Sequence, residues 1–190
     1  MLLFDKAKKH CLSLLFIAVS VFTLTGCIEP MYGPNVNGVS TATELQAIEV
    51  DEINDRTGHY VRNELIYALN GTGSTPTPRY RLKVTLSERV QTPIYNAQTA
   101  FSSSATVVVI AQYTLISLPD KVEISKGSTE SIASYDRFTA RFANVRASRD
   151  AAIRDAKVIA ENIRTRIAMD LAARRYLRDL RRIAVVDIRG

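Results

Sequence analysis

Cys27 is the residue whose surroundings most clearly predict chemistry, because small residues precede it in the sequence Leu24-Thr25-Gly26-Cys27. Upstream lies a run from Cys11 to Leu24 that is apolar except for two serines and one threonine. Lysines precede this run at positions 6, 8 and 9. A basic start, a short apolar run and small residues at a cleavage site are the parts of a secretory signal peptide. The run is shorter than the roughly 20 residues that a membrane-spanning helix needs.

The sequence that ends at Cys27 resembles the lipobox of bacterial lipoproteins. In that class the peptide is cut before the cysteine, the cysteine sulfur carries diacylglycerol, and the new amino terminus is acylated. The resemblance implies a signal peptide over residues 1–26 and a covalent lipid, such as palmitate, on Cys27. The alternative is ordinary secretory cleavage with Cys27 merely nearby.

Few other residues could carry out a reaction. Once residues 1–26 are removed, Cys27 and His59 are the sole cysteine and histidine of the sequence. A nucleophile with its base, a paired carboxylate site or a metal cluster needs more than these. Asp51, Glu52 and Asp55 fit a strand end and a helix cap better than a catalytic pair. The sequence therefore predicts a protein that is not an enzyme, with no metal and no cofactor besides the lipid.

The net charge of the chain limits the classes of partner that it could bind. Removing residues 1–26 takes away three lysines and one aspartate, which lowers the formal net charge from +6 to +4. A basic protein that is exported has no access to cytoplasmic nucleic acid, so we expect no nucleic-acid role. A positive charge suits a phosphorylated, anionic partner instead.

The elements that follow are predicted from hydrophobic periodicity. Residues 27–44 contain prolines and glycines without periodicity, which predicts a tether. A short strand is expected over Leu45–Val50, then a helix that Asp55 or Thr57 caps and that ends at Asn70-Gly71. His59 lies in its first turn and is interpreted as a surface residue.

Three strands and a long helix are expected after this helix. The strands are Arg79–Val90, which alternates cleanly, Thr106–Leu118, which is apolar on both faces, and Val122–Ala133. Gln91–Ser104 is expected to be a long hairpin tip, and Gly127 a β-bulge. Aromatic residues of Ser134–Arg146, namely Tyr135, Phe138 and Phe142, are expected to pack an irregular connection into the core. The helix is expected over Ala147–Leu177, followed by a basic tail at 177–190.

This order predicts an α+β two-layer sandwich, in which a four-stranded, largely antiparallel sheet carries two helices on one face. The opposite face would be open and would present Arg81 and Lys83. The expected domain organisation is a signal peptide at 1–26, a tether at 27–44, one α/β domain at 45–176 and the basic tail at 177–190.

Several segments, in order, resemble the LptE family of lipopolysaccharide-assembly lipoproteins, in its α-proteobacterial form. Cys27-Ile28-Glu29-Pro30-Met31-Tyr32-Gly33 is similar to the start of that family's mature chains. Further resemblances lie in Arg56–Leu65, Pro78–Val84, Ala133–Tyr135, Phe142-Ala143, Arg149–Ala151 and Ile163–Ala168. His59 stands where the family has glutamine, and the tail after Tyr176 is not part of the resemblance.

The resemblance implies an outer-membrane lipoprotein that plugs and helps assemble the LptD β-barrel and assists the insertion of lipopolysaccharide into the outer leaflet. Its expected partners are an LptD-like barrel, lipopolysaccharide and the outer membrane, with the domain facing the periplasm or the barrel lumen. Ile28 after the cysteine favours export to the outer membrane. The alternative is a free-standing lipid-anchored module that binds peptidoglycan or another envelope partner.

Basic residues near the strand ends are the candidate lipopolysaccharide contacts, because an exposed guanidinium or ammonium group binds phosphate. Arg89 ranks first, because it lies closest to the expected hairpin tip. The other candidates are Lys126, Arg81, Lys83, Lys121 and Arg79. For each of them, a solvated strand face is the alternative interpretation.

Overall fold

The computed structural model describes residues 32, 40–71, 76–92 and 104–187, all of which lie in one compact unit, Met31–Gly190. The predicted signal peptide, Cys27, nearly all of the tether and the hairpin tip lie outside the described residues. Among the described residues, no helix is both long enough and apolar enough to cross a bilayer.

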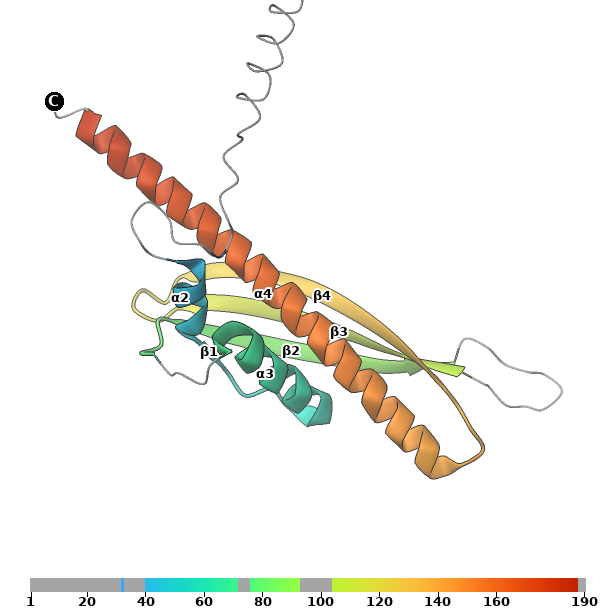
Figure 1. Cartoon of the computed structure of the whole chain (residues 1–190). Coiled ribbons are helices and arrows are strands. Elements are labelled where there is room, and N and C mark those ends of the chain that lie inside the picture. Colours follow the sequence, from blue (N-terminus) through green and yellow to red (C-terminus); the bar gives the residue numbers. More distant parts are fainter. Residues whose placement is uncertain (1–31, 33–39, 72–75, 93–103, 188–190) are drawn as a thin grey trace, which may run out of the picture. The chain divides into compact units, whose positions relative to one another are not determined.

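The fold is an α+β two-layer sandwich (Figure 1). Its sheet has the strand order β1-β2-β3-β4, with β1 parallel to β2 and the other pairs antiparallel. The predicted fold class is therefore confirmed. The elements, in chain order, are α2 (Thr41–Gln46), β1 (Ile48–Val50), α3 (Asp55–Asn70), β2 (Tyr80–Gln91), β3 (Ser104–Ser117), β4 (Glu123–Asp136) and α4 (Arg141–Asp187).

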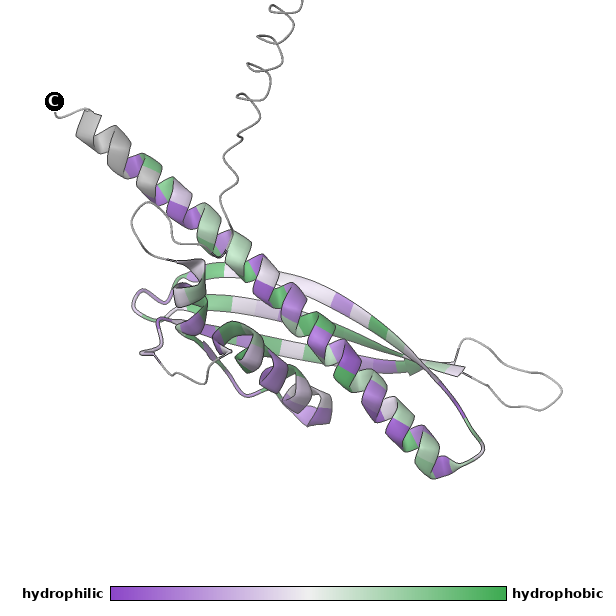
Figure 2. Cartoon of the chain, in the orientation of Figure 1, coloured by the Kyte–Doolittle hydropathy of each residue, from purple (hydrophilic) through white to green (hydrophobic). Residues whose placement is uncertain are grey.

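The two long helices cover one face of the sheet, and the core lies between the layers. Ile159, Ile163 and Ile167 of α4 are fully buried in the same apolar cluster as Val109 and Leu115 of β3. Figure 2 shows hydrophilic and hydrophobic residues alternating along α4, as expected for a helix with one covered face. Burial of each such isoleucine contributes about 1.5–3 kcal/mol to the free energy of unfolding.

α4 contacts the edge strand β4 through polar groups. Ser131 Oγ donates to Asp155 Oδ1 at 2.6 Å, and Asn162 Nδ2 donates to Thr129 Oγ1 at 3.2 Å. Ser125 donates to Asp170 farther along the same two elements. Arginines of α4 also donate to backbone carbonyls of β4, namely Arg154 to Ser134, Arg166 to Ser128 and Arg174 to Glu123. Such groups hinder the edge strand from pairing with a strand of another chain.

Four expectations about local structure are wrong. A short helix, α2, replaces the first part of the predicted strand Leu45–Val50, because Ser40 caps it by accepting from the Thr43 backbone N–H at 3.1 Å. Asn54, rather than Asp55 or Thr57, occupies the N-cap position of α3, and its side chain makes no capping hydrogen bond. Thr57 instead donates to Glu88 of β2.

The predicted bulge at Gly127 is absent, since Gly127 pairs in register with Tyr113, and the irregularity lies at Leu115/Ile116. A Cβ at Gly127 would lie 2.8 Å from Tyr113 Oη, so glycine makes room for the tyrosine ring. The aromatics expected in the core are also misplaced. Tyr135 packs against the core, but Phe138 is exposed and Phe142 is 72% exposed, because α4 begins at Arg141 and carries Phe142 outward.

Candidate functional site

The sheet face that lies away from α3 and α4 is called the open face here, and it consists of alternate residues of each strand. Along β2 these are Arg81, Lys83, Thr85, Ser87 and Arg89, while Tyr80, Leu82 and Val84 between them are buried. Arg81 and Lys83 therefore lie on the face that the sequence alternation predicted for them.

The strand register arranges the candidate cations in rows across the open face. Lys83 lies opposite Thr114, which in turn lies opposite Lys126 of β4, so two lysines share one row. Arg89 lies opposite Val108, which lies opposite Ile132. The structure thus brings Arg81, Lys83, Arg89 and Lys126 onto one surface from two strands.

Ion pairs divide these four cations into two groups. Arg81 is paired with Glu49 at 3.2 Å and with Asp51 at 3.4 Å, and Lys126 with Glu123 at 3.2 Å. Among the described residues, neither Lys83 nor Arg89 forms an ion pair. An anionic ligand on the open face would therefore meet a cation without an ion-pair partner at Arg89, whereas Lys83 lines a pocket together with Asp51, Glu52 and Asp55.

Ile132 is an exposed apolar residue in the same row as Arg89, and the sequence analysis did not identify it as part of a site. Ile132 is 63% exposed, whereas Val108, which lies between it and Arg89 in the register, is buried. Apolar residues on both faces of Thr106–Leu118, Val108 among them, were interpreted only as evidence for a central strand. The row therefore offers one cation and one exposed apolar side chain on either side of a buried valine.

The remaining candidates, Lys121 and Arg79, do not lie on the open face. Lys121 follows the turn between β3 and β4 and is exposed. Arg79 lies just before β2, where its guanidinium carbon is 5.8 Å from the centroid of the Tyr80 ring. Both residues are therefore at one end of the sheet.

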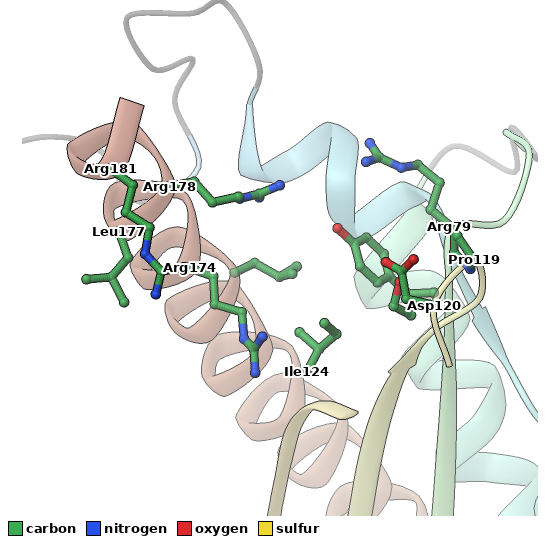
Figure 3. A pocket seen from close by; sticks show the side chains of 11 residues that line it. Arg79, Pro119, Asp120, Ile124, Arg174, Leu177, Arg178 and Arg181 are labelled. Carbon is green, nitrogen blue, oxygen red and sulfur yellow. The ribbon is translucent and has the colours of Figure 1, made fainter. Parts of the chain in front are cut away.

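A pocket of about 530 Å³ lies at that end, between the sheet and the C-terminal half of α4 (Figure 3). We call it the arginine pocket. Figure 3 shows Arg174, Arg178 and Arg181 extending from α4, with Arg79 and Asp120 on the sheet side. Its lining residues include Arg79, Tyr80, Ser117, Asp120, Ile124, Leu171, Arg174, Leu177, Arg178 and Arg181. Burial, followed by the nearby charge of Glu44, raises the pKa of the Tyr80 hydroxyl above its ordinary value.

A buried ion pair joins α2 to α4 beside this pocket. Glu44 of α2 lies 3.4 Å from Arg175 Nε and 3.9 Å from Arg178 Nη2, and both Glu44 and Arg175 are buried. Thr41 of α2 also accepts from Arg175. These contacts hold α2 against the C-terminal half of α4. The sequence analysis assigned no role to these arginines.

Comparison with known proteins identifies the class of fold. No family model matches the chain, and no curated protein matches it. Among solved structures, a predicted lipoprotein from Caulobacter crescentus is similar, with a TM-score of 0.58 and 23% identity over 70% of this chain and 96% of that one. A minor lipoprotein from Acinetobacter baumannii has a TM-score of 0.50 and 15% identity over 65% of this chain and 90% of that one.

At these identities the likeness establishes a shared fold. The chain therefore has the two-layer α+β fold of these two solved structures, both of which are described as lipoproteins.

Proposed function

We propose that this protein is an outer-membrane lipoprotein, anchored through Cys27, that occupies the lumen of an LptD-like β-barrel and assists the insertion of lipopolysaccharide. Two independent lines support the lipoprotein part of the proposal. The sequence at Leu24–Cys27 resembles a lipobox, and two solved structures that share the fold are described as lipoproteins. The protein is proposed to act by binding, without catalysing a reaction.

The observation that carries the lipopolysaccharide part is the row Arg89–Val108–Ile132 on the open face. Lipopolysaccharide carries phosphate groups on a body with long acyl chains. Arg89 and Lys83 can bind phosphate through charge-assisted hydrogen bonds. Exposed Ile132 offers apolar surface in the row of Arg89, six residues along the sheet from the row of Lys83. An otherwise polar sheet face also suits a water-lined barrel lumen.

Binding to purified lipopolysaccharide at fixed salt tests this assignment. Reversing two charges, in the variant Lys83→Glu/Arg89→Glu, should weaken binding by about tenfold or more, which corresponds to about 1.4 kcal/mol. The matched control is Lys157→Glu with Arg149→Glu, two exposed cations of α4, the helix on the other face of the sheet, and neither forms an ion pair among the described residues. Equal losses in both variants would show that net charge, rather than the open face, determines binding.

The double variant Arg89→Ala/Lys126→Ala compares a cation that forms no ion pair, Arg89, with one that does, because Lys126 is already paired with Glu123. We expect Arg89→Ala alone to account for most of the loss in the double variant. An unchanged affinity in the double variant would remove the open face from the proposal.

Gentle detergent extraction tests the barrel partner. The protein should co-purify with a large outer-membrane β-barrel at one-to-one stoichiometry. Extraction as a small particle would support the free-standing envelope module instead. Labelling with palmitate tests the anchor, because Cys27→Ser should abolish incorporation of the label.

A further inference from the structure

The C-terminal half of α4 has an exposed apolar stripe that no described element covers. Tyr176 is 64% exposed, Leu177 55% and Leu180 45%, and Met169 is exposed about two to three turns earlier. At 100° per residue, these four side chains project within about a third of the helix circumference. Large apolar side chains gathered in this way mark an interaction surface more often than isolated ones do.

Arginines lie next to this stripe. Arg174, Arg178 and Arg181 project on the flank that faces the arginine pocket, where Arg79 joins them from the sheet side. Asp120 is the one acidic side chain among the residues that line this pocket. A helix with an apolar stripe beside a basic flank has the composition of helices that lie in the interfacial region of a bilayer.

The entry point of the chain favours a bilayer over other occupants. The buried contacts between Glu44 and Arg175 hold α2 beside this same half of α4. Tyr32, five residues after Cys27, packs against α4, with the Arg164 guanidinium carbon 4.6 Å from its ring centroid. If Cys27 carries a lipid, which is part of the proposed function, that lipid can lie at most about 17 Å from Tyr32. Arg164 is about 20 Å along the helix from Leu177 but about 33 Å from Phe142. The membrane surface would therefore lie within reach of the arginine pocket.

We propose that the C-terminal half of α4 and the arginine pocket form a second membrane contact, which docks on anionic phospholipid. Leu177, Leu180 and Tyr176 enter the headgroup region, while Arg174, Arg178 and Arg181 bind lipid phosphates. This contact sets the orientation of the domain on the membrane, which a lipid on a tether alone cannot do.

The other end of α4 provides a matched control. Phe142 is 72% exposed and Val145 49%, and Arg146 and Arg149 accompany them. The chemistry of the two ends is therefore similar. Phe142 lies about 50 Å along the helix from Leu177, away from α2. If the apolar stripe beside the arginine pocket makes the contact, rather than any exposed apolar residue near an arginine, the two ends should differ in membrane binding even in a chain that carries no lipid.

The test uses the mature chain, residues 27–190, with Cys27→Ser, so that no acyl chain contributes to binding. Sedimentation with vesicles of phosphatidylcholine, with and without phosphatidylglycerol, measures the partition of the protein. We expect binding to the anionic vesicles that weakens as salt increases, and much weaker binding to phosphatidylcholine alone.

Two variants separate the contributions. Leu177→Asp/Leu180→Asp removes the apolar stripe, and Arg174→Gln/Arg181→Gln removes two charges while leaving the Glu44–Arg178 pair in place. Each should weaken binding to anionic vesicles by about tenfold or more. Phe142→Asp/Val145→Asp should leave binding within about twofold of the parent chain. Circular dichroism of each variant checks that the fold is retained.

Three results would overturn this proposal. They are no binding of the parent chain to anionic vesicles, an equal loss in the Phe142/Val145 control, and unchanged vesicle binding in both C-terminal variants. In the last case, loss of barrel co-purification would identify the barrel wall as the occupant. Because the test protein carries no lipid, its failure is distinguishable from a failure of palmitate labelling at Cys27.

Discussion

The two sides of α4 are attached to the sheet in different ways. Toward β3 and α3 the helix buries isoleucines among valines and leucines. Toward β4 it presents Asp155, Asn162 and Asp170 to serine and threonine hydroxyls. The hydrophobic contact has no directional preference, whereas each hydrogen bond requires one particular register. The comparison indicates that the apolar side supplies most of the stability and that the polar side fixes where β4 lies.

Truncating the apolar side should have the largest effect. Ile163 is fully buried in the core cluster, so Ile163→Ala removes apolar contacts and leaves a cavity. We expect the free energy of unfolding to fall by about 2–5 kcal/mol, measured from urea denaturation midpoints. Val158→Ala, at a half-exposed site on the same helix, should change it by less than about 1 kcal/mol. Similar losses at the two sites would contradict the division of α4 into a core side and a solvent side.

Enlarging the small residues of β4 should have an intermediate effect. A side chain at Gly127 would meet the buried Tyr113 ring, with Tyr113 Oη at 2.8 Å from the new Cβ. Gly127→Val should therefore destabilise the fold by about 1–3 kcal/mol, although valine is favoured in strands.

Ser128→Val, at the exposed neighbouring position of the open face, is the control. It should change the free energy of unfolding by less than about 0.5 kcal/mol. Stabilisation by Gly127→Val would show that the tyrosine ring moves aside freely and that packing against β4 is loose.

The apolar side of α4 could be predicted from the sequence, and the polar side could not. Ile163, Ile167 and Leu171 recur at helical spacing, and Arg79–Val90 alternates, so local periodicity identified the core and the open face. Periodicity depends on neighbours in sequence. It predicted the face on which Arg81 and Lys83 lie, because successive side chains of a strand point to opposite faces of the sheet.

The partners of the polar side are far apart in sequence and have no periodic signal. Ser131 and Asp155, or Ser125 and Asp170, are joined only after β4 and α4 pack together. The arginine pocket was missed for the same reason. Two of its arginines, Arg178 and Arg181, fell in the predicted tail at 177–190, whereas α4 continues to Asp187 and brings them to the same pocket as Arg79. Phe142 was misplaced because an apolar side chain was expected to be buried.

Asp155 makes the polar side sensitive to pH. Burial raises the pKa of its carboxyl above the ordinary value of 3.8, against the opposing effects of the Ser131 hydrogen bond and the Arg154 charge. The Asp155 Oδ2 atom has no hydrogen-bond partner among the described residues. The charged form of Asp155 is therefore less stable in the folded protein than in the unfolded chain.

The sign of the pH dependence follows from this shift. Because its folded-state pKa is the higher one, the folded protein binds the Asp155 proton more tightly than the unfolded chain does. The contribution of Asp155 to stability therefore falls as pH rises from about 4 through the raised pKa. Below about pH 4 the carboxyl is protonated in both states and this penalty disappears.

Asp155→Asn tests this dependence with the smallest expected change, because asparagine keeps an oxygen that can accept from Ser131. The variant should gain stability relative to the parent chain as pH rises from 4 to neutrality, measured from urea midpoints at several pH values. Asp150→Asn, an exposed residue of α4 that also pairs with Arg154, is the matched control. Its difference from the parent should vary less with pH, because no burial penalty is relieved there. If the free energy of unfolding of Asp155→Asn differs from that of the parent chain by the same amount across this pH range, the polar side of α4 positions β4 without any electrostatic cost.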